Sequence, residues 1–270
     1  MSAPIPATKV SEVLHYFGVP CFKNLNPFSS IGKKKAELKK SMGDLISKDP
    51  IAAHTGLGVI YIYENEDDLA LKEFKAAYDK SNHSTHQAYH YANALFVNGR
   101  FEEANSIYKE IIKDNQNSQE YFIQVVKRFS EFCFFEDLEE ILTTSYISRN
   151  MPEAAETDVS DGYRIKDFLD KYNISVKFYR DIRNSIDKVF YKFFSLPTQV
   201  DYTTFFDFEE FTYCLEIDPK FFKDPISGIT EMNEVLQDYF IDNYEKHNVK
   251  LGSNEDRITA YYSLALKVEA

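Results

Sequence analysis

The sequence predicts a mainly α-helical protein, in which three similar helical hairpins are followed by a small α+β domain. Three observations predict this fold class. Similar residues recur with a period of 34 between residues 51 and 148. Only 9 of the 270 residues are glycine and 9 are proline, which leaves little material for the many tight turns of an all-β fold. After Pro197, apolar and polar residues alternate as they do in half-buried strands.

The composition is that of a globular chain, with 44% hydrophobic and 27% charged residues. A net charge of −12 argues against a nucleic-acid-binding protein, because such proteins neutralise phosphates with basic residues. The chain has no run of about 18 apolar residues, so we expect no membrane-spanning segment, and its first residues lack the pattern of a secretory signal. The cysteines Cys21, Cys133 and Cys214 form no CxxC pair or disulfide framework. We therefore expect a cytoplasmic protein with reduced thiols.

Residues 1–50 do not share the period and form an N-terminal segment. A loop-like stretch runs from Pro20 to Pro27, and a lysine-rich helix that caps the helical stack is expected around residues 33–40. Its five lysines could meet phosphate or an acidic partner. A solvated helix face is the commoner role of such a charge run.

Residues 51–150 are expected to contain the three hairpins, in units 51–84, 85–118 and 119–148. A shift of 34 places Ala104 on Ala70 and Tyr108 on Phe74. The third unit is degenerate and has Leu138 in the place of the small residue. Small residues let paired helices approach closely, while aromatic side chains fill the space beside them. Because one hairpin cannot bury its own apolar stripe, neighbouring hairpins have to stack.

The pattern Leu57-Gly58-x-x-Tyr61, followed by Ala70-x-x-x-Phe74-x-x-Ala77, resembles the tetratricopeptide repeat (TPR) family, whose unit is about 34 residues. The second unit keeps this pattern through residues 98–104, Asn-Gly-Arg-Phe-Glu-Glu-Ala. The resemblance covers about 100 residues. It implies a groove, lined by the first helix of each repeat, that binds an extended peptide or a partner helix.

By this resemblance and by helical geometry, ten residues would line the partner-binding groove. They are Thr55, Val59 and Tyr63 from the first unit, His86, Tyr89, His90, Asn93 and Val97 from the second, and Gln124 and Lys127 from the third. Family members that grip the carboxyl end of chaperones use a lysine, arginine and asparagine clamp, which only Asn93 fits here. Binding of a chaperone tail is therefore disfavoured. The alternative is a groove filled by the protein's own second domain.

The second domain is expected to be an acidic α+β unit over residues 163–270. Residues 150–162 lack apolar periodicity and are predicted to be a linker. Helices are predicted over residues 163–172, 175–194 and 229–244, and strands over 202–208, 211–217 and 258–268, in the order α-α-β-β-α-β. After Phe194 the chain has 6 basic and 15 acidic residues, a net charge of −9.

Catalytic and metal-binding motifs are weak in this sequence. His83, His86 and His90 cluster, and His86 and His90 share a helix face at i, i+4, a spacing that can hold a metal. However, no glutamate separates them as in the HExxH motif, and no cysteine lies nearby. Nucleotide-binding and nucleophile motifs are also missing. We therefore expect no enzyme, no cofactor and no metal, and a metal-dependent enzyme that uses the three histidines is the least favoured hypothesis.

The favoured function is a non-catalytic scaffold or adaptor that binds a protein or peptide partner, with no role in binding nucleic acid or membrane. A second hypothesis is an inhibitor or immunity-type protein whose acidic C-terminal domain covers a basic enzyme. It depends on the net charge of −9 after Phe194. A solvated acidic surface that aids solubility is the commoner explanation of such a charge.

Overall fold

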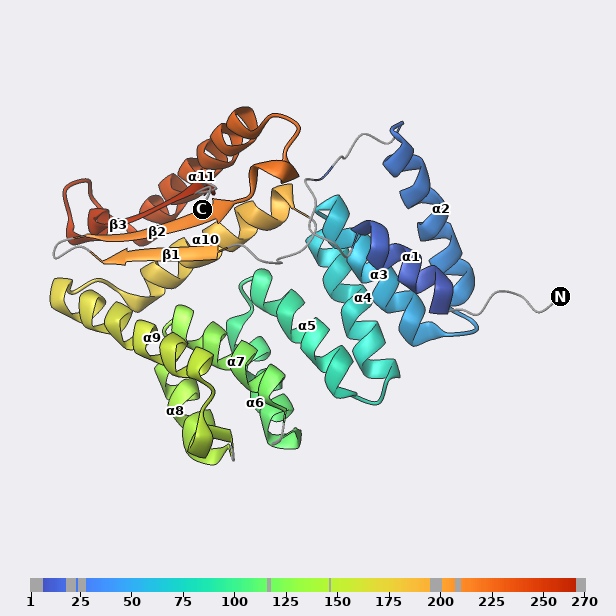
Figure 1. Ribbon diagram of the computed structural model, residues 1–270, viewed down its shortest axis with the longest axis horizontal. Helices are drawn as coiled ribbons and strands as arrows, with labels where there is room; N and C mark the ends of the chain where they lie inside the picture. The colour runs from blue at the N-terminus through green and yellow to red at the C-terminus, as the bar shows by residue number, and fades with distance from the viewer. Residues whose placement is uncertain are drawn as a thin grey trace, which may run out of the picture. The chain divides into compact units, whose positions relative to one another are not determined.

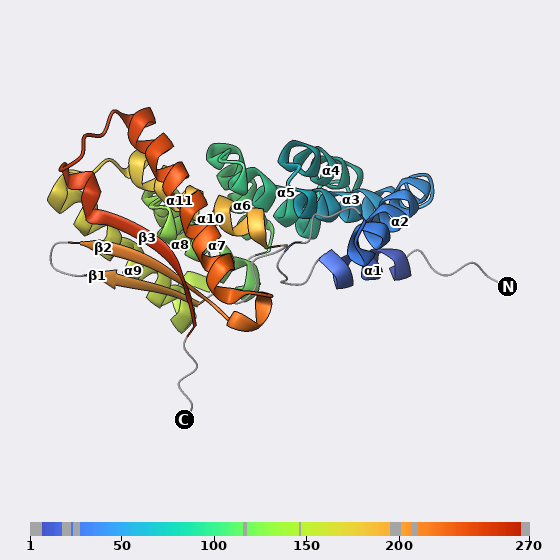
Figure 2. The same ribbon diagram turned by 90° about the horizontal axis from the view of Figure 1, so that it is seen from above.

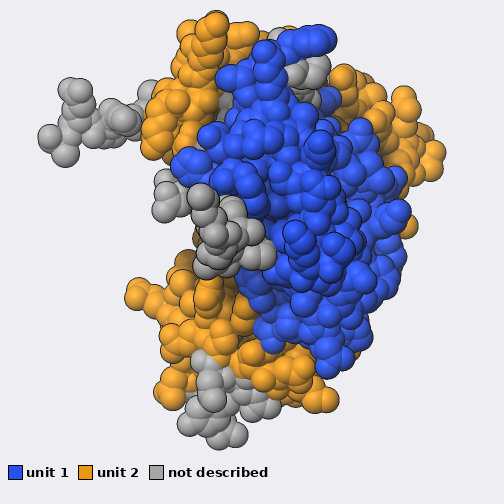
Figure 3. Space-filling view, turned by 90° about the vertical axis from the view of Figure 1, so that its right-hand side faces the viewer, with its two compact units in different colours: residues 1–107, 190–199 blue, residues 108–189, 200–270 orange. Residues whose placement is uncertain are grey.

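The computed structural model describes residues 7–17, 23, 28–115, 118–145, 147–194, 201–206 and 210–265. Helices make up most of this part of the chain, and a small sheet with a long helix follows near the C-terminus (Figure 1). The predicted fold class is therefore confirmed. The chain forms two compact units, coloured separately in Figure 3. Unit 1 contains residues 1–107 and 190–199, and unit 2 contains residues 108–189 and 200–270.

Unit 1 is helical. Its elements are α1 (Ala7–Phe17), α2 (Ser30–Leu45), α3 (Pro50–Glu64), α4 (Asp67–Lys80), α5 (Thr85–Val97) and the first half of α6 (Phe101–Asp114). The sequence analysis predicted no helix at the position of α1. Both α1 and α2 pack against α3.

The predicted lysine-rich helix is α2, and three of its five lysines pair with carboxylates of the same chain. Lys34 Nζ lies 3.0 Å from an oxygen of Glu12 in α1. Lys35 and Lys39 lie 3.2 and 2.7 Å from the two oxygens of Glu64 at the end of α3. These lysines therefore connect α2 to its neighbours instead of forming a bare basic face.

The three predicted hairpins are present as α3–α4, α5–α6 and α7–α8. The last pair comprises α7 (Gln119–Glu131) and α8 (Phe135–Thr144). In each hairpin the connection contains one residue with a left-handed backbone: Asn65 at φ 60°, Gly99 at φ 75° and Cys133 at φ 56°. These three positions are 34 residues apart, so the period of the sequence is also the period of the turns. The left-handed region is easily reached by glycine and asparagine, whereas cysteine adopts it at some cost.

Close helix approach in the first hairpin requires Gly58. A Cβ at this position would lie 2.8 Å from ring carbons of Phe74, which is 3% exposed. The small residue in α3 and the aromatic residue in α4 thus fit together, as the repeat pattern predicts.

Unit 2 contains the third hairpin, two further helices and the sheet. Besides the second half of α6, its elements are α7, α8, η1 (Ile147–Asn150), α9 (Glu153–Tyr172), most of α10 (Val176–Phe193), β1 (Asp201–Phe206), β2 (Phe211–Ile217), η2 (Pro219–Phe221), α11 (Pro225–His247), η3 (Asn254–Arg257) and β3 (Ile258–Leu264). The predicted order α-α-β-β-α-β is confirmed. The predicted strand residues 207–208 and 266–268 lie outside the described residues.

The predicted linker over residues 150–162 is wrong from Glu153 onward, because α9 begins there. Small residues form the face of α9 that packs on α7, and an apolar period in the sequence does not reveal such a face. Ala155 and Gly162 are buried, and a Cβ on Gly162 would lie 2.9 Å from the Cβ of Ser130 in α7. The predicted domain boundaries at residues 150 and 163 differ from the observed division, which assigns the third hairpin to the same unit as the sheet.

The sheet has the order β1-β2-β3, with β1 antiparallel to β2 and β2 parallel to β3. Helix α11 connects the parallel strands and lies along β3 (Figure 2). One face of β2 is apolar and packs on helices, since the Phe211 ring contacts Phe168 of α9 and Tyr179 of α10. On the edge strand β3, the Asn233 side chain of α11 bonds both the N–H and the C=O of Tyr262. Helix α11 therefore covers backbone groups that an edge strand would otherwise expose.

Candidate partner-binding surface

Three of the ten predicted groove residues are in α3, and all three are buried. Thr55, Val59 and Tyr63 are 7%, 6% and 2% exposed. Thr55 Oγ1 donates a hydrogen bond of 2.9 Å to Gln87 Oε1 of α5, and the Tyr63 ring lies 4.8 Å from the Phe17 ring of α1. These side chains therefore pack between helices of unit 1 and do not form an open surface.

The five predicted residues of α5 are in a different environment. They lie on one side of the helix, at i, i+3, i+4, i+7 and i+11: His86, Tyr89, His90, Asn93 and Val97. His86 is exposed and the other four are half-buried. Tyr89 and Asn93 also make contacts within the protein. This set, called here the α5 surface, combines an aromatic ring, an amide and an apolar side chain that solvent can reach.

The last two predicted residues, Gln124 and Lys127, are on α7 in unit 2. Gln124 is exposed. Lys127 is half-buried, and its Nζ lies 3.8 Å from Glu131 Oε1. This pair lies at the edge of a network of buried charges.

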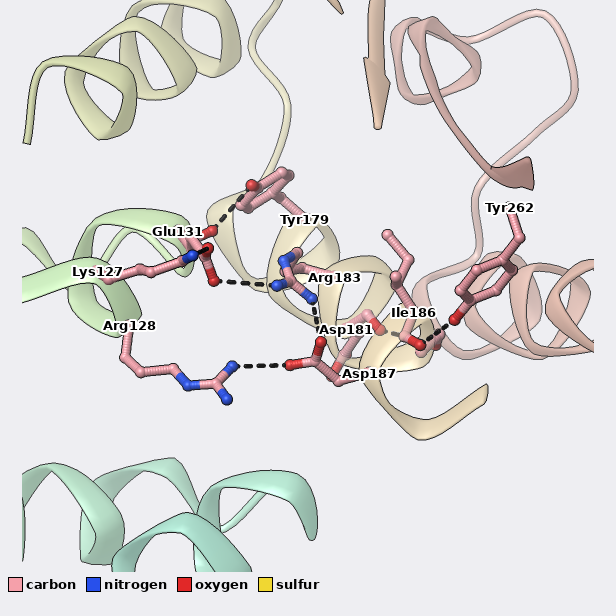
Figure 4. A network of polar contacts seen from close by, with 10 residues as sticks. Lys127, Arg128, Glu131, Tyr179, Asp181, Arg183, Ile186, Asp187 and Tyr262 are labelled. Carbon is pink, nitrogen blue, oxygen red and sulfur yellow. Dashed lines mark hydrogen bonds and ion pairs between the residues drawn. The ribbon is translucent and has the colours of Figure 1, made fainter. Parts of the chain in front are cut away.

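Arg183 of α10 is the centre of this network (Figure 4) and is 1% exposed. Its Nη1 donates to Asp187 Oδ1 at 2.6 Å, and its Nη2 donates to Glu131 Oε2 at 3.0 Å. Arg128 donates to the other oxygen of Asp187 at 3.0 Å. Two guanidinium groups are thus matched by two carboxylates, as the burial of charge requires.

The sequence analysis missed the role of Arg183, although the sequence contains a signal. Arg183 and Asp187 are four residues apart within the apolar stripe of α10, where a charged pair has to be satisfied internally. The guanidinium also lies 4.9 Å from the ring centre of Phe132 and 4.8 Å from that of Tyr213. The network ties α7, α10 and β2 together, and both Nη atoms of Arg183 pair with carboxylates inside it, so we interpret it as structural.

Among the described residues of unit 2, the carboxyl groups of Asp158 and Asp181 have shifted pKa values. Burial raises the pKa of Asp158 to about 6. For Asp181, burial acts in the same direction, but hydrogen bonds from Lys246 at 2.8 Å and His247 at 2.6 Å outweigh it and lower the pKa. A perturbed carboxyl is typical of both catalytic sites and structural ion pairs, and the Asp181 cluster is of the second kind because it joins α10 to α11.

A buried lysine that the sequence analysis did not single out is Lys23 in unit 1, which is 8% exposed. Its Nζ donates to the carbonyl of Ile62 at 2.6 Å, to Asn65 Oδ1 at 2.7 Å and to the carbonyl of Tyr191. Its backbone N–H donates to the Phe193 carbonyl at 2.7 Å. The cation thus lies where the C-terminal ends of two helices, α3 and α10, present their carbonyl groups, a position that the helix dipole favours.

The three clustered histidines separate into a pair and a single residue. His86 and His90 approach with their Nε2 atoms 3.1 Å apart. The His83 ring instead stacks on Tyr78 at 4.3 Å, and its backbone is left-handed. Among the described residues, no three or more histidine, cysteine, aspartate or glutamate side chains are grouped to hold a metal ion. His83 therefore lies apart from the pair, because the turn before α5 directs it elsewhere, and the least favoured hypothesis, a metal-dependent enzyme that uses all three histidines, finds no three-histidine site among the described residues.

In the part of the chain that the structure describes, no helix has both the length and the apolar character needed to cross a bilayer. A family model described as Tetratricopeptide repeat matches residues 63–123, from the end of α3 to the first part of α7. No curated protein and no solved structure matches the chain. Repeats of this family generally bind proteins, so the match indicates a role in protein interaction. The resemblance seen in the residue pattern is therefore confirmed over residues 63–123, which match the model of this family.

Proposed function

We propose that this chain is a non-catalytic, cytoplasmic scaffold or adaptor that binds a peptide or a partner helix through the α5 surface. One observation carries the proposal. Positions that are buried in α3 are half-exposed in α5, one repeat later: Thr55 matches Tyr89, Val59 matches Asn93, and Tyr63 matches Val97. The α5 surface lies within the matched residues 63–123.

The chemistry of the α5 surface suits a peptide chain. The Asn93 amide can both donate to and accept from a peptide backbone. Tyr89 offers a large, rigid contact area with a polar tip, a residue type that is enriched at interfaces. Val97 adds an apolar contact at the end of the helix. Gln124 and Lys127 on α7 belong to unit 2 and are proposed as a separate contact, which is tested on its own below.

The α5 surface can be tested by comparing the proteins that variants capture from lysate, with EDTA present so that bound metal plays no part. The test variant carries Asn93→Ala and Val97→Ser. The control variant carries Lys72→Ala, an exposed residue of α4. A partner of the α5 surface should be captured equally by the wild type and the control and should be depleted in the test variant, while all three proteins melt at similar temperatures.

Identical captured sets for all three proteins would remove the α5 surface from the proposal. Gln124→Ala tests α7 independently. Depletion with Gln124→Ala but not with the α5 variant would move the binding surface to unit 2.

A second candidate function, the inhibitor hypothesis, is favoured by α11. Five exposed carboxylates recur every three or four residues along one side of this helix: Glu231, Glu234, Asp238, Asp242 and Glu245. Within the described residues, no basic side chain forms an ion pair with any of the five. A partner with a basic surface would complement this stripe and associate quickly at low salt.

This second candidate predicts capture of a basic protein that is released as salt rises from about 0.05 to 0.3 M, because salt screens exposed charges. Replacing the five carboxylates by their amides should abolish that capture. A captured set that responds neither to salt nor to these substitutions contradicts the inhibitor hypothesis and leaves the α5 proposal unaffected.

A further inference from the structure

We infer that His86 and His90 form a two-histidine chelate for a divalent transition-metal ion of the zinc class, with water in the remaining coordination positions. The inference goes beyond the proposed function, because the chain alone would bind the ion and no partner is needed.

The distance between the two ring nitrogens fits such an ion. His86 and His90 are one helical turn apart on α5, and their Nε2 atoms are 3.1 Å apart. Zinc–nitrogen bonds of 2.0–2.1 Å at a tetrahedral angle place two ligand nitrogens about 3.3 Å apart. A square-planar arrangement with bonds of this length brings them to about 2.9 Å. The observed separation lies between these two values, so the spacing of the two nitrogens already suits the ion.

The surroundings hold one ring in place and leave the other accessible. The His90 ring stacks on Phe74, with ring centres 6.0 Å apart and planes 17° from parallel. Phe74 is itself buried in the hairpin, so the direction of the His90 Nε2 is largely fixed before a ligand arrives. His86 is exposed, which leaves room on its side for water ligands. A chelate with one ring already ordered loses less conformational entropy on binding.

The histidines of the described chain differ in their polar partners. In the described part of the chain, no carboxylate forms an ion pair with His86 or His90. By contrast, His54 Nδ1 lies 2.6 Å from Glu73, and His247 Nε2 lies 2.6 Å from Asp181. The pair on α5 therefore offers two ring nitrogens that carboxylates do not already occupy.

The test is a titration of the full chain with zinc chloride, followed by NMR of the histidine ring nitrogens. We expect the Nε2 resonances of His86 and His90 to shift together and to saturate at one ion per chain. Calorimetry should show that His86→Ala weakens zinc binding by at least about 10–100-fold, the loss that follows when even an outer-shell partner of a metal site is removed. Because His86 is exposed, this variant should keep its melting temperature. His83→Ala removes a neighbouring histidine and should bind zinc like the wild type.

The chelate would be contradicted if neither Nε2 resonance shifts with zinc, as expected if the rings share only a hydrogen bond, or if one ring shifts without the other. It would also be contradicted if His86→Ala binds zinc as tightly as the wild type, because the ion would then lie at another histidine. None of these outcomes bears on the α5 proposal, which is tested with EDTA present.

Discussion

Helices α3 and α5 are the first helices of successive repeats, yet they have different surroundings. In α3, Thr55, Val59 and Tyr63 are buried, while the matching residues of α5 are half-exposed. Part of the cause is local, since α1 and α2 pack against α3 and the Phe17 ring of α1 contacts Tyr63. The repeat pattern therefore determines how helices pair within a hairpin, but the neighbours of each hairpin determine whether its first helix offers a binding surface.

The matched positions Gly56 and His90 show the same difference. A Cβ on Gly56 would lie 2.6 Å from Met42 Sδ and 3.9 Å from a methyl group of Val13, so glycine lets α1 and α2 approach α3. The matching position in α5 has a full imidazole ring that stacks on Phe74. Glycine at this position of α3 thus allows other helices to cover α3, whereas α5 has enough space at the same position for an imidazole ring.

The largest expected effect is at Tyr63. Tyr63→Ala removes a fully buried ring that packs on Phe17, and we expect a loss of about 3–5 kcal/mol in the free energy of unfolding. The matched change Val97→Ala removes a smaller, half-exposed side chain and should cost less than about 1.5 kcal/mol. Urea unfolding of both variants measures the difference. Equal losses would mean that α3 and α5 are not covered differently.

The second largest effect on stability is expected at Gly56 of α3. Gly56→Leu places a side chain where Met42 and Val13 already lie, and such overpacking should cost about 1–3 kcal/mol. His90→Leu puts the same side chain into the half-buried equivalent position of α5 and should change stability by less than about 1 kcal/mol. A thermal melt of each variant is sufficient. A Gly56→Leu variant as stable as the wild type would contradict the packing described for α3.

The pH dependence of stability should report on the half-buried His90 of α5. The pKa of His90 falls from its usual 6.5 to about 4 in the folded chain, so the unfolded chain binds more protons between these pH values. The His90 contribution to stability is therefore fully present above pH 6.5 and is lost as pH falls to about 4. The loss should be on the order of 1–2 kcal/mol, allowing for partial exposure to solvent.

His90→Gln should flatten this part of the pH profile, as measured by urea unfolding from pH 4 to 7. His83→Gln serves as the matched control and should leave the profile unchanged. A profile that keeps its slope in His90→Gln would show that another group is responsible.

The smallest effect is expected for the hydrogen bond between α3 and α5. Thr55→Val keeps the shape of the side chain but removes the donor to Gln87, which should cost about 1 kcal/mol. A double-mutant cycle with Gln87→Leu separates this bond from the other contacts of each residue. A coupling energy near zero would mean that the two side chains do not stabilise one another.

Much of the fold could be predicted because it follows from local pattern. The period of 34 predicted the hairpins and recurs in the turns at Asn65, Gly99 and Cys133. Alternation predicted β2 and β3, and the i, i+3, i+4 stripe predicted α10. What the sequence did not reveal depends on contacts between distant segments. Helix α1 is short, but Val10, Val13, Leu14 and Phe17 do form an apolar stripe at helical spacing, which the sequence analysis overlooked. The start of α9 is polar and gives only a weak periodic signal.

The candidate surface was predictable only in part, for the same reason. Helical geometry selects one side of α3 and of α5 equally well, but it does not show that Phe17 covers Tyr63. The separation of His83 from the histidine pair was also hidden, because it depends on left-handed backbone at Asn82 and His83. By contrast, the spacing of His86 and His90 did indicate that their rings would meet.

The most direct test of the central claim is site-specific photo-crosslinking in lysate. A photoreactive amino acid replaces Asn93 on the α5 surface in one protein and Lys72 on α4 in another. If the α5 surface binds a partner, position 93 should give a discrete crosslinked product that is absent at position 72, and Val97→Ser should reduce its yield. No product at position 93, or the same products at both positions, would contradict the claim.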